Sequence, residues 1–486
     1  MKYEPVIGLE VHAEMQTCSK MFCGCPVVDS TRVKPNVAVC PVCAGMPGVL
    51  PVVNRQAVEY ALRVALALEC TVAKTSLFER KNYFYPDLPK GYQISQYQNP
   101  LAQHGRLVID TQSGERVIRI NRVHLEEDAG KLTHVEKDGQ HYSLVDLNRA
   151  GVALLEIVSE PDLRSVEEAR AYTEGLRAVL RALGVNSGDM EKGVIRFEAN
   201  ISIRPAGGTL LGTRTEVKNL NSFRAMERSI AFEIERQSAL LDAGGQVEQE
   251  TLGWDEITNR TYSQRSKEDA HDYRYFAEPD LPPLVVEPEW VEQVRTALPE
   301  LPRARAQRFA REYDLSAAEA GLVAADGDVA AYFEAVLREA RNVTPKMALN
   351  WLSGEVFAWQ NASGRRLDEL KVRPEMLADL LERTANGEIN LPTAKKVLHE
   401  MIASGLSAAN VIDASSLNQI SDGAEITRLV AEVIDANPGE LEKYLSGKES
   451  VANWFFGQAM HLAGKRANPA MLRAELQRQL ERKQQG

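Results

Sequence analysis

The N-terminal fold is decided by the stretch Pro5-Val6-Ile7-Gly8-Leu9-Glu10-Val11-His12-Ala13. Apolar Ile7, Leu9 and Val11 alternate with Gly8, Glu10 and His12, which is the period of a strand with one apolar face and one polar face. Residues 194–204 alternate in the same way and place Glu198 and Asn200 on their polar face. Both stretches therefore predict strands whose polar faces carry groups able to do chemistry.

The rest of the chain divides into a strand-rich part and a helical part. The first 285 or so residues contain strand patterns and one helix, which Ser165 begins, Glu168 supports as a capping box, and Gly184 ends. A Pro-rich stretch at 278–283 precedes a change to helical spacing, in which Thr344-Pro345 and Asn468-Pro469 open helices. We predict an α+β protein with an antiparallel-rich mixed domain at 1–290, a helical domain at 291–405 and a helical tail at 406–486.

Length and composition agree with this division. The chain has 486 residues, and about 150 residues per domain gives roughly three domains. Charged residues make up 26% and no apolar run reaches the length of a membrane span, so we expect a cytoplasmic protein without a signal peptide or membrane segment. The net charge of -11 argues against coating nucleic acid by bulk electrostatics, although residues 465–483 form a local basic patch.

Five of the six cysteines lie close together in the sequence. Cys23-x-Cys25 and Cys40-x-x-Cys43 are two thiolate pairs separated by a short loop, a spacing that can place four sulfurs tetrahedrally around zinc. The loop 18–45 is therefore predicted to hold a structural zinc ion. The alternative is four unconnected cytosolic thiols. Cys18 and Cys70 fall outside the pattern.

Carboxylates on strand faces form the second candidate site. Glu10, Glu198 and Glu216 lie on or next to strand-like runs, and His12 shares the face of Glu10. Another strand-like run is followed by Glu126, Glu127 and Asp128. Hard oxygen ligands with an imidazole suit a magnesium ion that handles phosphate. Taken one at a time, solvated outward strand faces explain these residues equally well.

An aromatic segment with basic residues is the third candidate. Arg80-Lys81-Asn82-Tyr83-Phe84-Tyr85-Pro86-Asp87 could stack on a base and hold phosphates, or could be a core strand with a solvated end. No P-loop, dinucleotide-binding fingerprint, Ser-Ser-Lys amidase signature or nucleophile elbow occurs.

Several whole segments resemble one family. They include Val6-Ile7-Gly8-Leu9-Glu10-Val11-His12, the aromatic segment at 80–87, Glu216-Val217-Lys218-Asn219-Leu220-Asn221-Ser222, and residues 19–23, 40–43, 47–54, 91–96, 124–131, 143–149, 156–162 and 272–276. Together these segments resemble the B subunit of the glutamyl/aspartyl-tRNA amidotransferases over most of residues 5–285, and the helical tail is similar to that family's C-terminal domain.

The resemblance implies a cradle-shaped, kinase-like domain that uses ATP and magnesium, then a helical domain and a tail that grips tRNA. Such an enzyme is a glutamine-hydrolysing carbon–nitrogen ligase. It phosphorylates the side-chain carboxylate of misacylated Glu-tRNA(Gln) or Asp-tRNA(Asn), and ammonia then displaces the phosphate to give Gln-tRNA or Asn-tRNA. A separate amidase, the A subunit, supplies the ammonia and a small C subunit completes the heterotrimer, which agrees with the missing amidase signature.

The resemblance also assigns roles to residues. Glu10, His12, Glu127 and Glu216 match metal-site positions with catalytic roles, and Lys81 matches a catalytic lysine near the nucleotide and acceptor-end pocket. Substrate- or ATP-binding positions are Tyr83, Asn148, Glu198 and Asn200, although Phe197-Glu198-Ala199-Asn200 departs from the family's usual Cys-Asp-Ala-Asn. The structural zinc ligands would be Cys23, Cys25, Cys40 and Cys43, and the tRNA-binding positions of the tail would be Lys465, Arg466 and Arg473.

Two other classes of function compete with this prediction. A non-catalytic tRNA-binding scaffold would carry the same strand carboxylates as solvated residues. A zinc-dependent hydrolase would need an open metal position, which four cysteine ligands do not leave.

Overall fold

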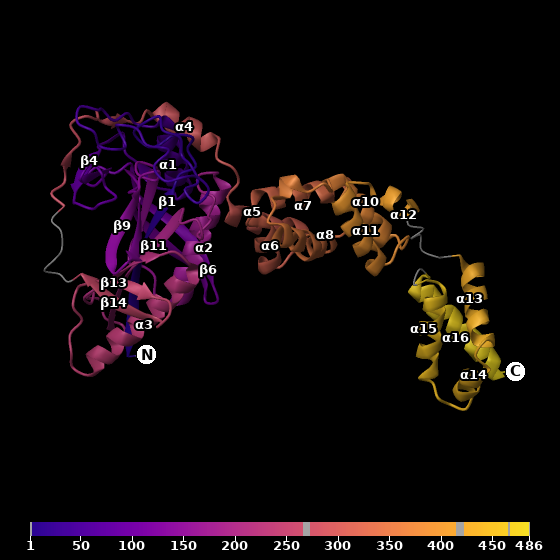
Figure 1. The fold of residues 1–486 in the computed structure, drawn as a ribbon. Helices are drawn as coiled ribbons and strands as arrows, with labels where there is room; N and C mark the ends of the chain where they lie inside the picture. Colours follow the sequence, from indigo (N-terminus) through magenta and orange to yellow (C-terminus); the bar gives the residue numbers. More distant parts are fainter. Residues whose placement is uncertain (1, 266–272, 415–421, 465–466, 486) are drawn as a thin grey trace. The chain divides into compact units, whose positions relative to one another are not determined.

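The computed structural model describes residues 2–265, 273–414, 422–464 and 467–485. The chain forms two compact units, Met1–Pro302 and Arg303–Gly486 (Figure 1). The first unit contains all the strands of the described residues, and the second contains only helices. The α+β prediction is therefore confirmed. The described helices include none with the length and apolar character that a membrane crossing requires.

A nine-stranded sheet forms the centre of the first unit. Its strand order is β14-β13-β12-β11-β1-β10-β7-β6-β2, and every neighbouring pair is antiparallel except β12 and β13. The strands are β1 (Tyr3–Glu14), β2 (Thr71–Val72), β6 (Ala102–Thr111), β7 (Gly114–Glu127), β10 (Ala153–Ser159), β11 (Ile195–Pro205), β12 (Thr215–Leu220), β13 (Thr251–Asp255) and β14 (Arg260–Arg265). Both predicted strands, β1 and β11, are neighbours at the middle of this sheet.

Three helices cover the apolar face of the sheet: α1 (Arg55–Ala67), α2 (Val166–Ala182) and α3 (Phe223–Asp242). Ile7, Leu9 and Val11 of β1 are fully buried beneath them, so the alternation in the sequence correctly identifies the buried face. The side chain of Ser165 caps α2 as predicted. A capping box would need the Glu168 carboxylate to accept from the backbone N–H of the N-cap, Ser165. It accepts instead from the N–H of Arg164, the residue before the N-cap, so the capping box is not formed.

Smaller sheets flank the central one. β4 (Glu79–Asn82) pairs with β5 (Tyr92–Ser95) and β15 (Phe276–Ala277), β3 (Thr75–Ser76) pairs with β16 (Leu284–Val285), and β8 (Lys131–Lys137) forms a hairpin with β9 (Gln140–Asp146). Helix α4 (Pro288–Thr296) buries Val294 in the core of this unit. The unit consequently extends to Pro302 and not to the expected boundary at residue 290.

The second unit contains two separate hydrophobic cores. The first core is built by α5 (Pro302–Tyr313), α6 (Ala317–Ala324), α7 (Gly327–Glu339), α8 (Pro345–Trp351), α10 (Pro374–Ala385), α11 (Leu391–Ser404) and α12 (Ala408–Ala414), with a π-helical turn at Leu352–Val356, α9 (Phe357–Ser363) and a 3-10 turn at Leu367–Glu369. Because Val411 and Ile412 belong to this core, it continues past the expected boundary at residue 405. The second core is built by α13 (Gly423–Asp435), α14 (Pro438–Leu445), α15 (Val451–Leu462) and α16 (Pro469–Gln485).

Gly105 in β6 permits a close approach of backbone and side chains. A Cβ atom at this position would lie 2.3 Å from Sγ of Cys70 and 2.6 Å from the carbonyl oxygen of Leu68. Gly105→Ala is therefore expected to destabilise the first unit by about 1–3 kcal/mol, because the sheet edge must shift. Thermal unfolding of the full chain measures this loss. Gly175→Ala in α2, where the new methyl meets only ordinary contacts, should be neutral or stabilising, and equal melting temperatures for the two variants would contradict the packing argument.

Candidate functional site

The polar face of the central sheet gathers two groups of acidic side chains. The first group consists of Glu10 from β1, Glu198 from β11 and Glu216 from β12, and one oxygen from each lies within 4.8 Å of the others. We call it the Glu10 group. Strand pairing brings these residues together because Glu10 is opposite Glu198, and Asn200 is opposite Glu216. Three carboxylates from three neighbouring strands thus share one patch of the face.

Hydrogen bonds hold the Glu10 group in place. Asn200 donates from Nδ2 to Oε1 of Glu10 at 2.9 Å, and Lys218 donates from Nζ to Oε2 of Glu198 at 2.7 Å. Burial and the neighbouring carboxylates of Glu156, Glu198 and Glu216 raise the pKa of Glu10. Burial also works against the charge of Glu198, but Lys218 and His12 outweigh it and keep the pKa of Glu198 below its ordinary value. The group therefore concentrates negative charge that one resident lysine partly offsets.

The second group consists of His12 from β1, Glu126 from β7 and Glu156 from β10. We call it the His12 group. Nε2 of His12 lies 3.4 Å from Glu156 and 3.7 Å from Glu126, and His124 approaches Glu156 to 3.3 Å. Burial favours neutral His12, yet the hydrogen bond to Glu156 and the nearby carboxylates raise its pKa to about 9. The histidines in turn hold the pKa of buried Glu156 well below its usual range, despite its burial.

Both groups fit a hard divalent cation. The Glu10 group offers three carboxylates, and the His12 group offers two carboxylates and an imidazole. Magnesium accepts such ligands. Within the described residues, buried Oδ1 of Asn200 and Nδ1 of His124 have no hydrogen-bond partner. Buried polar atoms rarely stay unpaired, so these atoms leave room for a further ligand at each group.

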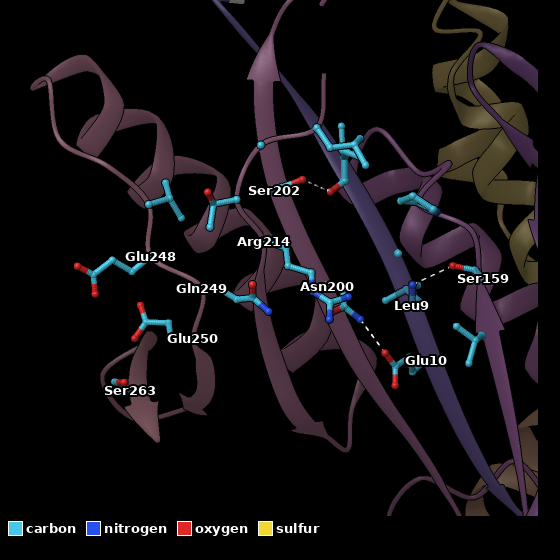
Figure 2. A pocket seen from close by; sticks show the side chains of 18 residues that line it. Leu9, Glu10, Ser159, Asn200, Ser202, Arg214, Glu248, Gln249, Glu250 and Ser263 are labelled. Carbon is cyan, nitrogen blue, oxygen red and sulfur yellow. Dashed lines mark hydrogen bonds between the residues drawn. The ribbon is translucent and has the colours of Figure 1, made fainter. Parts of the chain in front are cut away.

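A cavity of about 1080 Å³ adjoins the Glu10 group. Figure 2 shows Glu10 and Asn200 at its floor and Arg214 above them, with Glu248, Gln249 and Glu250 on the opposite side. Its walls come from the loop between β11 and β12 and from the loop that precedes β13. Gly8 of β1 also lines it, so part of the floor is bare backbone. The cavity is large enough for a nucleotide-sized ligand.

Lys81 and Tyr83 lie in an aromatic cluster beside the His12 group. Nζ of Lys81 is 5.0 Å from the ring centre of Tyr273 and 5.8 Å from that of Tyr83. Tyr97 stacks on Tyr275 with ring centres 4.3 Å apart. Burial disfavours the charge of Lys81, but the Glu126 carboxylate and its neighbours raise the pKa of Lys81 above its ordinary value. The segment at 80–87 is thus neither a plain core strand nor a fully solvated one.

Two expected site residues lie elsewhere. Glu127 forms an ion pair with Lys90 and accepts from the backbone N–H of Ile94 at 2.9 Å, so it joins neither acidic group. Asn148 is buried, accepts from the N–H of Ala38 and donates to the carbonyl of Lys34. Consecutive residues of a strand point to opposite faces, so Glu127 points away from the face to which Glu126 points. The hydrogen bonds of Asn148 to Lys34 and Ala38 hold the cysteine loop instead.

The structure brings to the site several residues for which the sequence predicted no role there. Glu126 faces His12 in place of Glu127, and the alternation along β7 could have revealed this. The pairing of β10 with β7 brings Glu156 into the His12 group and places His124 beside Glu156, and the local sequence holds no signal for this pairing. Lys218 and Arg214 lie close to the predicted Glu216 in sequence and reach the Glu10 group and the cavity, respectively.

The four cysteines of the predicted zinc loop come together. The sulfurs of Cys23, Cys25, Cys40 and Cys43 all lie within 4.8 Å of one another. Sγ of Cys43 is 3.9 Å from the sulfurs of both Cys25 and Cys40, close to the roughly 3.8 Å that tetrahedral zinc with bonds of about 2.3 Å requires. The donor set therefore fits a structural zinc ion with four thiolate ligands. Fully buried Lys20 donates to Cys43 at 3.5 Å.

Of the three tail residues predicted to contact tRNA, only Arg473 lies in the described part of the chain. Arg473 of α16 lies over the ring of Phe456 at 4.6 Å from the centre. Lys465 and Arg466 lie outside the described residues.

Comparisons with known proteins give a consistent family for the whole chain. The GatB/GatE catalytic domain family matches residues 5–292, and the GatB domain family matches residues 331–480. The aspartyl/glutamyl-tRNA(Asn/Gln) amidotransferase B subunit of Moorella thermoacetica is 52% identical over 99% of this chain and 100% of its own length. Proteins of the same name from Myxococcus xanthus (98% of each chain) and Thermodesulfovibrio yellowstonii (97% of this chain, 98% of theirs) are 49% and 47% identical. The chain belongs to the family of aspartyl/glutamyl-tRNA amidotransferase B subunits.

Proposed function

We propose that this chain provides the kinase and transamidase activities of a tRNA-dependent amidotransferase. It phosphorylates the side-chain carboxylate of misacylated Glu-tRNA(Gln) or Asp-tRNA(Asn) with ATP, and it directs ammonia onto the acyl phosphate. The observation that carries the proposal is the pair of acidic groups on one sheet face, next to a cavity that Arg214 lines. Membership of the B-subunit family supports the same reaction.

The two acidic groups are assigned different tasks. Glu10, Glu198, Glu216 and Asn200 hold magnesium on the nucleotide side, and Arg214 binds phosphate oxygens in the cavity. His12, Glu126 and Glu156 hold a cation on the side where Lys81 and the aromatic cluster receive the aminoacylated end of the tRNA. Bound magnesium would offset the charge that develops on the transferred phosphoryl group.

The chemistry explains why ATP is needed. A carboxylate is a poor electrophile, because its oxygen is a poor leaving group. Transfer of the terminal phosphoryl group of ATP to that oxygen forms an acyl phosphate and releases ADP. Ammonia then attacks the acyl carbon, and the bond between that carbon and the phosphate oxygen breaks. Inorganic phosphate leaves, and the side chain is now an amide. Lys81, whose Nζ lies 5.0 Å from the ring centre of Tyr273 in the aromatic cluster, is assigned to bind and orient the substrate carboxylate.

Partners supply what this chain lacks. We infer that an amidase, the A subunit, delivers the ammonia, that a small C subunit completes the heterotrimer, and that the enzyme acts in the cytoplasm where tRNA is charged. The helical unit and the tail, with Arg473, bind the body of the tRNA. Zinc in the cysteine loop is structural, since four thiolates leave no open position for a reacting group.

The test uses the assembled heterotrimer, misacylated tRNA, ATP and magnesium, with ammonium chloride in place of glutamine. Glu10→Gln is expected to lower the rate of amide formation at least about a hundredfold, because the nucleotide-side cation loses a charged ligand. The amino acid released from the tRNA is identified by chromatography, and tRNA binding is measured separately.

The matched control is Glu4→Gln, on the same strand but paired with Arg204 outside both groups. It should keep the wild-type rate. Undiminished product with Glu10→Gln would make the carboxylates bystanders and favour the non-catalytic tRNA-binding scaffold as the function of this chain.

A further inference from the structure

Lys218 places a cation inside the Glu10 group. It follows Glu216 by two residues on β12, so both side chains share one face of the strand. Its Nζ lies 2.7 Å from Oε2 of Glu198 and 3.1 Å from Oε1 of Glu216. The ammonium therefore binds two of the three carboxylates that are assigned to magnesium in the proposed function.

A divalent cation and the ammonium of Lys218 would repel each other if both bound the carboxylates of this group. A magnesium ion held by the same carboxylates would lie about 2.1 Å from their oxygens. The two positive charges would then be separated by only a few ångströms at a partly buried site, where like charges repel.

Lys218 remains charged under neutral conditions. The ammonium is the ordinary form of a lysine side chain at neutral pH, and the carboxylates of Glu198 and Glu216 at salt-bridge distance from Nζ favour that form. A charged ammonium that leaves these carboxylates needs another anion, because an unpaired charge inside protein is costly. The cavity that adjoins Glu10 is where such an anion would arrive.

We propose that Lys218 competes with the divalent cation for the Glu10 group and gives way only when the phosphate of a nucleotide in the cavity offers its ammonium a new partner. The inference rests on the proposed function and deepens it. Lys218 thereby makes metal binding and nucleotide binding depend on each other. Without nucleotide the Glu10 group holds the cation weakly, and with nucleotide it holds the cation tightly.

The experiment titrates the assembled heterotrimer with Mn²⁺, followed by electron paramagnetic resonance, with and without a non-hydrolysable ATP analogue. Lys218→Met keeps the length of the side chain and removes its charge. We expect Mn²⁺ alone to bind Lys218→Met at least about tenfold more tightly than wild type, because no charge-assisted hydrogen bonds must be broken first. We also expect the factor by which the analogue tightens Mn²⁺ binding to fall about tenfold or more.

Matched variants separate competition from other effects. Lys192→Met removes an ammonium that also lies between two carboxylates, those of Asp29 and Asp189, which belong to neither acidic group, and it should behave as wild type. Lys218→Arg keeps the charge and should keep weak Mn²⁺ binding. Lys218→Gln provides a second neutral variant in case Lys218→Met does not assemble.

Two outcomes would overturn the inference in distinguishable ways. If Mn²⁺ alone binds the neutral Lys218 variants no more tightly than wild type, while Glu10→Gln still abolishes one bound ion, Lys218 is a supporting residue and the proposed function stands. If neither Glu10→Gln nor Lys218→Met changes Mn²⁺ binding, the Glu10 group holds no divalent cation, and that part of the proposed function fails as well.

Discussion

Glu156→Gln is expected to lower the rate of amide formation about a thousandfold with ammonium chloride as the nitrogen source. Glu156 lies at the centre of the His12 group, buried within 3.4 Å of His12 and 3.3 Å of His124. The substitution keeps the shape of the side chain and removes the charge that both histidines face. Because Glu156 does not line the cavity, the Michaelis constant for ATP should change little. Steady-state kinetics with varied ATP measure both quantities.

Glu160→Gln is the matched control for this substitution. Glu160 follows β10 directly and accepts from Asn121 at 2.7 Å, outside both acidic groups. Wild-type kinetics are expected for this control. A large rise in the Michaelis constant for ATP in Glu156→Gln, without a loss of maximal rate, would place the nucleotide at the His12 group and reverse the two assignments. Unchanged kinetics would remove Glu156 from the mechanism.

Cys40→Ser is expected to abolish zinc binding, from about one ion per chain to less than a tenth. The remaining three thiolates cannot complete the tetrahedron, so the loop at 18–45 loses the ion that closes it. Loop residues hold the end of β9 and the residues after it, since the backbone N–H groups of Asn36 and Ala38 donate to Asp146 and Asn148, respectively. Elemental analysis gives the zinc content, and limited proteolysis of the full chain should cut the loop at least about tenfold faster.

Cys18→Ser tests the specificity of this effect, because Cys18 is exposed and outside the four-sulfur cluster. It should retain zinc and resist proteolysis as wild type does. Retention of zinc by Cys40→Ser would show that the four sulfurs do not act as one site. Gentle chelation should loosen the loop without an immediate loss of amide formation, whereas a rapid loss would indicate a catalytic role for zinc.

Local sequence patterns were sufficient for the features that depend on neighbours along the chain. The alternation around Glu10 identified the buried and polar faces of β1, because the side chains of a strand point alternately to its two sides. Ser165 and Thr344 begin helices as predicted, since their side chains bind the first free backbone N–H groups. The spacing of the cysteine pairs likewise anticipated a cluster that the structure contains.

The boundaries between domains were less accessible to sequence reasoning. The Pro-rich stretch at 278–283 marks a change of composition, but the first unit continues through α4 because Val294 packs in its core. In the same way, Val411 and Ile412 tie α12 to the core before it. A boundary is set by which core a side chain enters, and composition reports this only indirectly.

The sequence by itself determined that Glu10 and His12 share a polar strand face, and family resemblance then treated them as ligands of one metal site. The tertiary structure decided that they belong to different groups: Glu10 faces β11 and β12, whereas His12 faces β10 and β7. It also decided that Glu126, and not Glu127, joins His12. The physical reason is that each group is assembled across neighbouring strands that are far apart in the chain, so its members are fixed by strand order and register, which no local pattern encodes.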